Sequence, residues 1–587
     1  SRNGVGGHDL ASLLLGLPTS GSVPANAAAG EWYTKYYGAY IQDDWRVNSK
    51  LTVNFGLRIE HEDGLQEIQN RQTVAFDRNA TNPLDALVPK TGLLAGKSLK
   101  GGLVFAGVNG APTAQGNPGA IKPAPRGGFN YALDSKTVLR GGYGLFYAPW
   151  NYDTSAHGQT GFSRTTGLSQ SDASTEIPLT VLDNPFPGGL QQPIGSSLGL
   201  LTGTGGTVTF VDQTKGDPKV HQYSFDVQRE LPGNMALTLG YIGATSRDIG
   251  FGGTGAGTFI NINQIDPAVA RQVFPGPNGT WDAAALRASV PNPFFGIAGA
   301  GEFASRATIP AGQLLRPFPE FGDIRMIEST AGGKRQYNAA TFVLDKRLSP
   351  GFWGGRFSYT YSRVKDNQFG ESSTYQTRTA EPQNNYDLNA EYGISNFDSP
   401  HRIILAPIIK LPTPSGATGA KAAVLGGWNV SAIVELVSGS PLNAVLSAGT
   451  STTNLGLLGG RQRPNLTGDP NTSGSDNERV STVDNPGAKY FAANAFTNPG
   501  AGVYGNAPRT ITDARYQFRK NFDVVLAKET KFAGSQIGEI RFELLNLTNT
   551  AKFRGIDSNS IDSTAFGRIT QQAGFMRIWQ ISFRYRF

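Results

Sequence analysis

Residues 92–98, Gly-Leu-Leu-Ala-Gly-Lys-Ser, are the segment closest to a phosphate-binding motif. A nucleotide-binding P-loop needs four residues between its two glycines and a strand before them. Here three residues separate Gly92 from Gly96, and Pro89 lies just upstream. A second glycine-rich run, at 253–257, lacks the strand and helix that frame a dinucleotide-binding turn. We therefore expect both segments to be loops, and we expect no nucleotide cofactor.

Two further sets of residues have the atoms that metal chemistry needs. The histidines are His8, His61, His157, His221 and His401. None of them has the HExxH spacing or another spacing of a zinc site. Oxygen ligands suited to calcium occur at Asp469, Asn471, Asp476, Asn477 and Glu478. Their spacing does not match an EF-hand loop, so a solvated loop is the favoured interpretation. We expect no metal site, no catalytic residue and no enzyme activity.

Composition excludes several classes of protein. The 587 residues include no Cys, which excludes disulfides and thiolate chemistry. The formal charge of +7 is scattered, without the Lys/Arg run that would indicate a nucleic-acid partner. The longest apolar stretches, at 10–17 and 403–411, are shorter than the roughly 18 residues of a membrane helix. The chain begins at Ser1 without an initiator Met or signal peptide, which favours a piece of a longer protein.

The elements that would position any site are best seen in the last strand, 575–587. Its odd positions carry Phe575, Trp579, Ile581, Phe583, Tyr585 and Phe587, with Arg577 as the exception. From position 580 its even positions carry Gln580, Ser582, Arg584 and Arg586. A period of two places these sets on opposite faces of a β-strand. An apolar aromatic face and a polar face are typical of a strand in a bacterial outer-membrane barrel.

The same alternation recurs along the chain and predicts thirteen strands. They cover 34–47, 51–60, 125–133, 136–147, 220–230, 235–243, 336–348, 355–364, 401–410, 427–437, 521–529, 537–545 and 575–587. We expect Leu51, Val53, Phe55, Leu57, Ile59, Phe357, Tyr359 and Tyr361 to face lipid. We expect Thr52, Asn54, Arg58, Ser358 and Thr360 to face the lumen. The predicted domains are a loop segment at 1–33, with a short helix, and the C-terminal part of a barrel at 34–587.

The connections between these strands alternate in length. Turns within hairpins are short, whereas the links at 61–124, 148–220, 244–335, 365–400, 447–519 and 546–573 are long. Outer-membrane barrels have short periplasmic turns and long extracellular loops. The predicted fold is therefore an all-β, antiparallel transmembrane barrel. Its long loops are expected to emerge on the side opposite Phe587.

Two groups of side chains could contact a solute. Charges expected on the lumen face are Arg58, Glu60, Arg140, Arg356, Glu435, Arg541, Glu543, Arg584 and Arg586. They could contact a plug or line a solute path, although hydration of a polar interior is the favoured interpretation. Loop aromatics are Phe274, Trp281, Phe294, Phe295, Tyr490 and Phe491. Ligand binding and packing of the loops against themselves explain these aromatics equally well.

Several motifs together resemble a known family. The hairpin at 37–58 contains Tyr-Gly-Ala-Tyr-Ile-Gln-Asp-Asp-Trp-Arg followed by Leu-Thr-Val-Asn-Phe-Gly-Leu-Arg, and resembles a hairpin of TonB-dependent outer-membrane transporters. The strand at 138–147 is similar to another strand of that group. With the motifs at 228–234 and 541–549 and the terminal Phe587, the chain resembles the Oar-like branch. Members of this branch carry a carboxypeptidase-regulatory-like domain, a plug and a large barrel.

The resemblance implies a barrel of twenty-two strands, of which about thirteen are present here. It implies outer-membrane lipid, the protein's own N-terminal plug domain and the TonB complex as partners, in a Gram-negative bacterium. The implied function is import of a large or scarce, unidentified solute, energised through TonB. The alternatives are a surface-exposed adhesin or assembly protein that binds a partner through its long loops, a passive diffusion channel and, more distantly, a soluble β-enzyme.

The strand count also predicts how the sheet ends. Thirteen strands cannot form the circumference of the implied barrel, and an unpaired edge facing lipid is unfavourable because its backbone groups lack partners. We expect the strands at 34–47 and 575–587 to be the two edges of an open, curved sheet.

Overall fold

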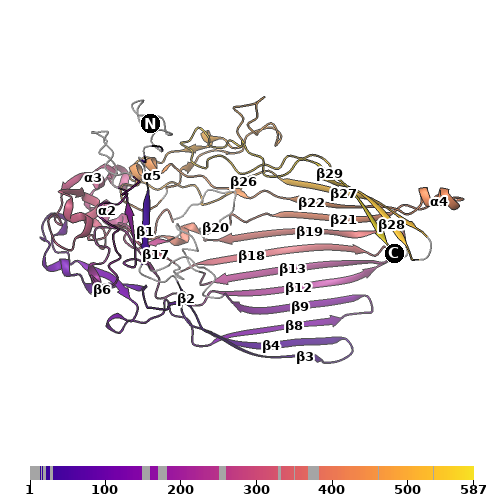
Figure 1. Ribbon diagram of the computed structural model, residues 1–587, viewed down its shortest axis with the longest axis horizontal. Helices are drawn as coiled ribbons and strands as arrows, with labels where there is room; N and C mark the ends of the chain where they lie inside the picture. Colours follow the sequence, from indigo (N-terminus) through magenta and orange to yellow (C-terminus); the bar gives the residue numbers. More distant parts are fainter. Residues whose placement is uncertain are drawn as a thin grey trace.

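A computed structural model describes most of the chain, and its main feature is one large antiparallel sheet. The described residues are 14, 16, 21–26, 31–148, 159–168, 182–249, 259–327, 332–348, 351–367, 382–460, 462–532 and 535–587. The sheet has 14 strands, in the order β29-β28-β27-β22-β21-β19-β18-β13-β12-β9-β8-β4-β3, with β20 (Gly393–Ile394) paired to β19 off this path. Figure 1 shows these strands side by side.

The strands along this path confirm the thirteen predicted from the sequence, with small shifts at their ends. Their bounds are β3 Tyr36–Arg46, β4 Leu51–Glu62, β8 Lys122–Ala132, β9 Thr137–Tyr147, β12 Lys219–Leu231, β13 Met235–Arg247, β18 Lys334–Lys346, β19 Trp353–Asp366, β21 His401–Lys410, β22 Trp428–Val437, β27 Arg519–Lys531, β28 Ile537–Leu545 and β29 Ile578–Arg586. A transmembrane β-strand needs about 9–11 residues, and these strands reach or exceed that length.

Cross-strand register places the two predicted side-chain sets on opposite faces. One row of directly paired residues runs Thr52, Asn130, Arg140, Asp226, Gly240, Thr341, Thr360 and Arg402. The next row runs Leu51, Tyr131, Leu139, Val227, Leu239, Phe342, Tyr359 and Ile403. The first row is polar or glycine and the second is apolar, so each of these two rows keeps one character across eight strands.

The apolar face is not covered by other parts of the described chain. Phe55 is 52% exposed, and Leu57, Ile59 and Tyr361 also count among the exposed apolar side chains. A soluble protein would bury such a continuous apolar surface because its contact with water is unfavourable. An exposed apolar face is what contact with lipid requires.

Short polar turns connect the hairpins at one end of the sheet. In the turn between β3 and β4, the Asn48 Oδ1 atom accepts hydrogen bonds from the backbone N–H groups of Lys50 (2.8 Å) and Leu51 (2.9 Å). Between β12 and β13, Gly233 and Asn234 adopt φ values of 80° and 59°. Glycine and asparagine tolerate this left-handed conformation better than other residues, which fixes the turn at this position.

The long connections lie at the opposite end of the strands from the C-terminus, as predicted (Figure 1). The described parts of these connections pack together into one body, which we call the head. The link between β21 and β22 is longer than the other turns within hairpins. It contains α4 (Gly419–Leu425), which projects beyond the sheet at the end where the short turns lie. The predicted orientation of the long loops relative to Phe587 is therefore confirmed.

The head has its own secondary structure, which the sequence did not indicate. Its strand pairs are β1 (Ser22–Asn26) with β10 (Ser163–Gly167), β2 (Trp32–Tyr33) with β5 (Gln66–Glu67), β6 (Thr73–Thr81) with β7 (Lys100–Phe105), β15 (Ser289–Pro291) with β16 (Thr308–Pro310), β23 (Pro441–Leu442) with β26 (Ile511–Arg515) and β24 (Asn465–Leu466) with β25 (Phe496–Thr497). A three-stranded sheet joins β11 (Val208–Val211), β17 (Ile324–Ile327) and β14 (Ile260–Asn261). Short helices include α2 (Pro267–Val273), α3 (Ala283–Arg287) and α5 (Ala448–Leu455). The predicted segment 1–33 thus contains strands β1 and β2, while the short helix expected within 8–17 lies outside the described residues except at 14 and 16.

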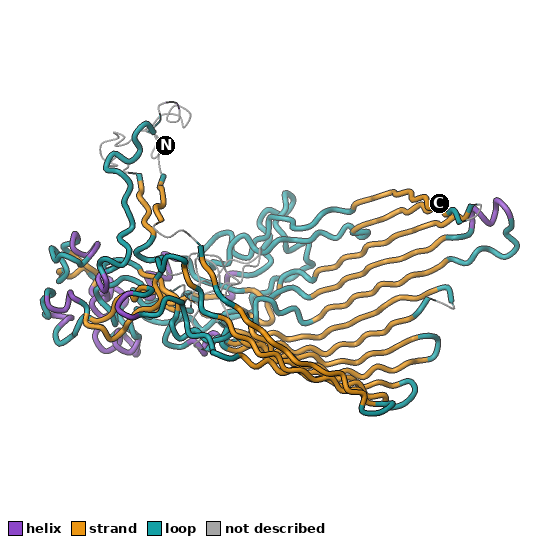
Figure 2. The backbone as a smooth tube through the Cα atoms, turned by 60° about the horizontal axis from the view of Figure 1, so that its bottom comes forward, coloured by secondary structure: helices purple, strands orange, loops and turns teal. Residues whose placement is uncertain are grey.

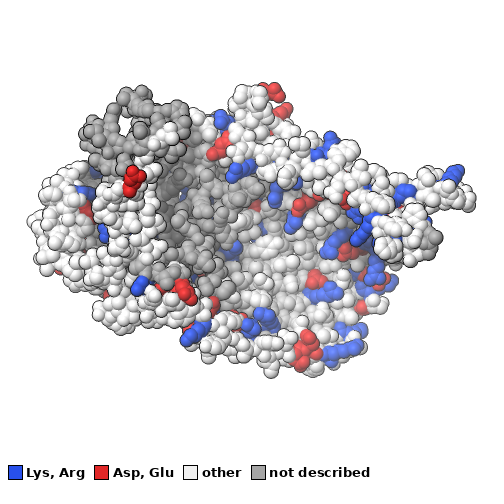
Figure 3. Space-filling model, in the orientation of Figure 1, with Lys and Arg blue, Asp and Glu red and all other residues white. Residues whose placement is uncertain are grey.

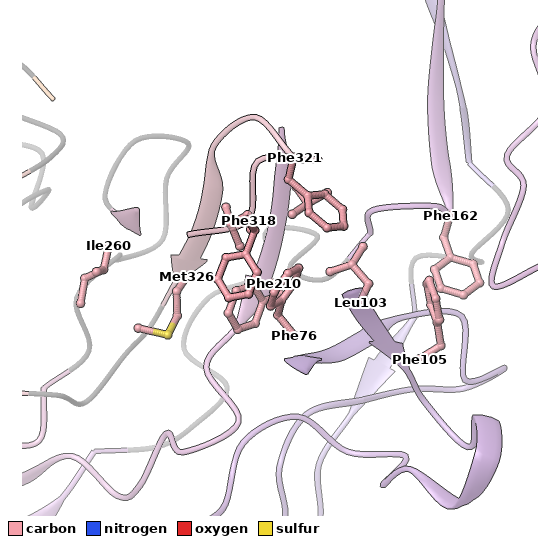
Figure 4. Packing of buried hydrophobic residues seen from close by; sticks show 11 residues of the cluster. Phe76, Leu103, Phe105, Phe162, Phe210, Ile260, Phe318, Phe321 and Met326 are labelled. Carbon is pink, nitrogen blue, oxygen red and sulfur yellow. The ribbon is translucent and has the colours of Figure 1, made fainter. Parts of the chain in front are cut away.

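Apolar clusters hold the head together. In the cluster of Figure 4, the Phe76 ring meets the rings of Phe318 and Phe321 edge-on, at centroid distances of 5.2 and 5.5 Å. Phe105 contacts Phe162 in the same way at 5.8 Å. These residues come from three different long connections. Burial of aromatic rings stabilises such contacts, so the connections form a packed unit rather than independent loops.

The sheet does not close into a ring. β3 and β29 lie at the two ends of the strand order, and no backbone pairing joins them. Figure 2 shows the sheet as a curved, open wall. Both predicted edges are confirmed, and each leaves one row of backbone N–H and C=O groups without a strand partner.

Because of these edges, we expect the 587-residue chain expressed alone to insert poorly into lipid vesicles and to associate through β3 and β29. Refolding into vesicles, followed by gel electrophoresis of unheated samples, would measure the fraction of compact monomer. We expect oligomers and little monomer. A monomeric species that resists unfolding before heating would contradict this prediction, because it would show that the ring closes.

Candidate functional site

The polar face of the sheet brings together most of the charges that the sequence placed in the lumen. Arg541 pairs with Glu543 (2.8 Å) and Glu539 (3.4 Å), and Arg58 pairs with Glu60. Further pairs on this face are Arg402–Glu435 (2.8 Å), Arg356–Asp345 (3.7 Å) and Arg586–Glu529 (3.3 Å). Arg140 and Arg584 have no ion pair among the described residues. Figure 3 shows acidic and basic side chains interspersed over the strands. Most of the predicted lumen charges thus neutralise one another along the wall.

A cavity of about 750 Å³ lies along the polar face near the β3 edge. Its lining includes Gln42, Asn54, Arg126, Arg140 and Ser224, from β3, β4, β8, β9 and β12. Several glycines on these strands leave space for it. A Cβ atom at Gly128, for example, would lie 2.6 Å from the Asn54 side-chain oxygen. The lining also includes Phe129 and Phe146, so this part of the wall combines small residues, hydrogen-bonding groups and aromatic rings.

A buried ionic network joins the head to the end of the sheet. Asp366, at the end of β19, is 1% exposed and pairs with Arg509 and with Arg335 (3.3 Å), and the Ser395 hydroxyl donates to it at 2.6 Å. Asp398 is fully buried and pairs with Arg515 at 2.6 Å and with Arg363 at 3.3 Å. Buried carboxylates need such partners because burial disfavours an isolated charge.

The network continues into the head through one further ion pair. Glu391 is 1% exposed, and Arg463 Nη1 lies 2.7 Å from one of its carboxylate oxygens. The second oxygen accepts the backbone N–H of Gln383 at 3.0 Å. Arg509 Nε also donates to the Glu391 backbone carbonyl at 3.2 Å. Two long connections, at 365–400 and 447–519, and the end of β19 are thus fixed to one another.

A second cavity, of about 370 Å³, lies where the head meets the start of strand β27. Its lining includes Phe397, Tyr516, Arg519, Lys552 and Arg554. These residues come from the connections at 365–400, 447–519 and 546–573 and from the start of β27. The site therefore combines a polar wall, a folded head fixed above it and a cavity at their junction.

The sequence profile of one protein family covers nearly all of this chain. The family is described as "Outer membrane beta barrel domain", and it matches residues 1–580. This chain belongs to that family. As an outer-membrane β-barrel domain, it lies in the bacterial outer membrane, with its apolar sheet face toward lipid. No helix in the described part of the chain is long and apolar enough to cross a membrane.

Comparison with solved structures returns several outer-membrane proteins. They include the ferripyoverdine receptor of Pseudomonas aeruginosa bound to ferripyoverdine (10% identity, TM-score 0.35). They also include the Escherichia coli ferric-catecholate import receptor Fiu (9% identity, TM-score 0.39). The outer membrane transporter YddB from Escherichia coli is a third similar structure (9% identity, TM-score 0.40). Each alignment covers 94% of this chain but only 38%, 44% and 54% of the respective structure. No curated protein matches the sequence.

In this outer-membrane domain, the loop aromatics mostly form the core of the head. Phe294 and Phe491 are fully buried, and Trp281 and Tyr490 are 3% and 2% exposed. Phe274 is partly buried, whereas Phe295 remains 55% exposed. Packing of the loops against themselves therefore explains these residues better than ligand binding. The sequence could not distinguish the two because the packing partners lie in other connections.

The segments at 92–98 and 469–478 lie in long connections of the head, the first with a short 3-10 helix at Gly92–Leu94. Lys97 is directed into the head, where its Nζ donates to the Leu314 carbonyl at 2.8 Å, and burial lowers its pKa. Near the acidic segment, Asp469 accepts hydrogen bonds from Asn471, and Asp476 accepts the Tyr490 hydroxyl at 2.6 Å. Hydrogen bonds from Ser475 lower the pKa of Glu478. No group of three His, Asp or Glu side chains suited to a metal occurs in the described part of the chain. The run at 253–257 lies outside the described residues.

The described histidines lie at the head end of three strands, on the apolar face. His221 Nδ1 is 2.8 Å from the Tyr143 hydroxyl, and His401 Nδ1 is 2.8 Å from the Tyr359 hydroxyl. His61 stacks on Tyr37 with a centroid distance of 6.3 Å. This repeated His–Tyr arrangement is typical of amphipathic side chains at a membrane interface. His8 and His157 lie outside the described residues.

Residues 195–199, Gly-Ser-Ser-Leu-Gly, match the GxSxG spacing of a hydrolase nucleophile. That motif requires a sharp turn between a strand and a helix. Here the segment lies in a run of turns that leads into the short 3-10 helix at Gly199–Leu201. The Ser197 hydroxyl donates to the Ile194 carbonyl at 2.7 Å. The local structure is therefore that of a surface turn.

One carboxyl group in the head is buried without a partner. Glu320 is fully buried, and neither carboxyl oxygen has a hydrogen-bond partner among the described residues. Burial raises the pKa of Glu320 to about 8 from its ordinary 4.5. Between these pH values the folded head binds more protons than the unfolded chain. Its free energy of unfolding should therefore fall as the pH rises from about 5 to 8.

We expect Glu320→Gln to remove most of this pH dependence and to raise the melting temperature of the head at pH 8, because the amide carries no charge to bury. Thermal melting at pH 5 and pH 8 measures the effect. Glu302→Gln is the matched control, since Glu302 is an exposed residue paired with Arg306. An unchanged difference between the two pH values in Glu320→Gln would contradict the assignment.

Proposed function

We propose that this chain forms the head and part of the barrel wall of a TonB-dependent outer-membrane receptor that imports a solute. The observation that carries this proposal is the combination of a folded head and a polar wall, with a cavity where they meet. A passive channel needs an open pore, whereas here long connections pack into one body fixed to the wall by buried ion pairs. Such a head presents a preformed surface on which a solute can be selected before passage.

The same proposal accounts for the unpaired edges. Further strands would pair with β3 and β29 and close the wall into a ring, since a closed barrel satisfies every backbone group in the membrane. A plug would then lie against the polar face. Arg140, which has no ion pair among the described residues, and the cavity along β3–β12 offer hydrogen-bonding groups for that contact.

Solute depletion by the native bacterium tests the proposal. Cells with the gene intact and cells with the gene deleted would be grown in a defined medium, with and without a protonophore that collapses the inner-membrane gradient. The depleted solutes would be measured by mass spectrometry. We expect at least one solute whose depletion requires both the gene and the gradient. Depletion that persists with the protonophore would instead indicate a passive channel.

An adhesin or assembly protein is the second candidate function, and the exposed Phe295 and the projecting β1–β10 arm of the head favour it. If it is correct, deletion of the gene would change attachment of cells to a surface and leave solute depletion unchanged.

A further inference from the structure

The cavity at the junction of head and wall has an unusual charge pattern. Its lining contains three cationic side chains, Arg519, Lys552 and Arg554, and no Asp or Glu. Elsewhere on the polar face, most Arg side chains are paired with a carboxylate. None of the three cavity cations takes part in an ion pair within the described residues. The cavity therefore concentrates uncompensated positive charge.

Hydrogen bonds position two of these cations but leave most of their donors unused. Lys552 Nζ donates to the Asn521 side-chain oxygen at 2.9 Å, and Arg554 Nη1 donates to the Gln571 side-chain oxygen at 2.7 Å. An ammonium group has three N–H donors and a guanidinium group has five. Each bond uses one donor, so both groups remain able to bind an anion. The Arg519 guanidinium makes no hydrogen bond within the described residues and keeps all of its donors.

Neighbouring backbone contacts make this a built site rather than a chance gathering of flexible side chains. Phe553 N–H donates to the Gln517 side-chain oxygen at 3.1 Å, and the Gln517 amide donates to the Ala551 carbonyl at 2.9 Å. Ala573 N–H donates to the Lys552 carbonyl at 2.7 Å. These bonds tie the connection at 546–573 to the start of β27 and hold the cations around the cavity.

The lining also has apolar and aromatic side chains, beside the polar Asn396, Ser399, Ser440 and Gln517. Phe397, Tyr516, Phe553 and Ile569 face the same space as the cations. Phe397 is 44% exposed and lies beside the Arg335 guanidinium, 5.7 Å from its ring centroid. Tyr516 packs edge-on against the buried Phe491 at 5.4 Å. Aromatic and cationic side chains in one cavity suit a ligand that carries both an apolar ring and an anionic group.

We propose that this cavity binds a small organic oxyanion, a carboxylate or phosphate ester that carries an apolar ring. Arg519, Lys552 and Arg554 bind its charged group, and Phe397, Phe553 and Ile569 contact its ring. The volume of about 370 Å³ accommodates a molecule of this size. The inference rests on the proposed function, because it names the class of solute that the receptor recognises.

Binding of simple probes to the complete, detergent-solubilised receptor tests the proposal. Benzoate and phenyl phosphate represent the two oxyanions, and benzylamine is a cation of similar shape. Affinities would be measured by saturation-transfer NMR with titration. We expect binding of at least one oxyanion, weaker binding at higher salt and no binding of benzylamine. Equal binding of benzylamine, or no binding of either oxyanion, would overturn the proposal.

Substitutions assign the binding to this cavity. Arg519→Gln, Lys552→Gln and Arg554→Gln should each weaken oxyanion binding about tenfold, the effect of removing one hydrogen bond to a charged group. Arg568→Gln is the matched control, because Arg568 lies in the same connection but pairs with Asp557 at 3.4 Å outside the cavity. Unchanged affinity in all three variants would overturn the assignment. As a second measurement, Arg554→Glu should abolish oxyanion binding while the receptor still migrates as a folded barrel before heating.

The outcomes separate this inference from the proposed function. If depletion of a solute depends on the gene and the gradient but is unaffected by the three Gln substitutions, the cavity is not the recognition site and the import function stands. If no solute depends on the gene and the gradient, the import function is wrong, whichever probes bind.

Discussion

Arg463→Ala should destabilise the head by about 3–5 kcal/mol, the cost of removing one partner of a buried ion pair. The substitution leaves the Glu391 carboxylate, which is 1% exposed, without a cation among the described residues. It also removes the hydrogen bond from Arg463 Nε to the Ala507 carbonyl at 2.8 Å. Because Glu391 and Arg463 belong to different connections, we expect the effect to spread across the junction of head and sheet.

Hydrogen–deuterium exchange of the receptor in detergent would measure this effect. Peptides around Glu391 and Arg463 should exchange faster in the variant, while peptides from the centre of the sheet should not change. Arg568→Ala is the control, since its pair with Asp557 is more exposed and should contribute less than about 1 kcal/mol. The double substitution Glu391→Leu and Arg463→Met should be less damaging than Arg463→Ala alone, because it leaves no unpaired charge. Equal exchange in Arg463→Ala and Arg568→Ala would show that the ion pair does not hold the head.

Phe55→Arg should destabilise the assembled barrel by about 2–4 kcal/mol, the cost of a cation on the lipid face near the middle of the bilayer. Phe55 lies near the centre of β4 on the apolar face and is 52% exposed in the described chain. Asn54 is its neighbour on the polar face, where it lines the larger cavity. We expect Asn54→Arg to have little effect, because the new side chain would extend into a polar space.

Reversible unfolding of the complete receptor in vesicles would compare the free energies of unfolding of the two variants. The pair is well matched, since both introduce the same residue at adjacent positions of one strand. Similar losses of stability in the two variants would contradict the assignment of faces. A larger loss of stability in Asn54→Arg would mean that the polar face, and not the apolar face, is in contact with lipid.

The strands and their faces could be predicted because the signal for them is local. Leu51, Val53 and Phe55 alternate with Thr52 and Asn54, and this period of two is fixed by the geometry of a single strand. The pairing of neighbouring strands then follows from short turns such as the one at Asn48. The open edges at β3 and β29 followed from the strand count compared with the twenty-two strands that the family resemblance implies.

The head could not be predicted because its contacts join residues far apart in the chain. Phe76 packs on Phe318 and Phe321, and Glu391 pairs with Arg463. These partners are so far apart in the sequence that no periodic pattern indicates their contact. The aromatics of the long connections were therefore equally consistent with a binding surface and a core. Their burial in the described structure favours a core, with Phe295 as an exposed exception.

The sequence by itself determined the class of fold, the two faces of the wall, the side on which the long connections emerge and the strands that form the edges. Each of these depends on alternation or on order along the chain. Only the tertiary structure decided that the long connections form one packed head, that buried ion pairs fix it to the sheet and that Arg519, Lys552 and Arg554 line one cavity without a carboxylate. The physical reason is that packing and charge pairing depend on distances in space, which side chains from separate connections acquire only when the chain has folded.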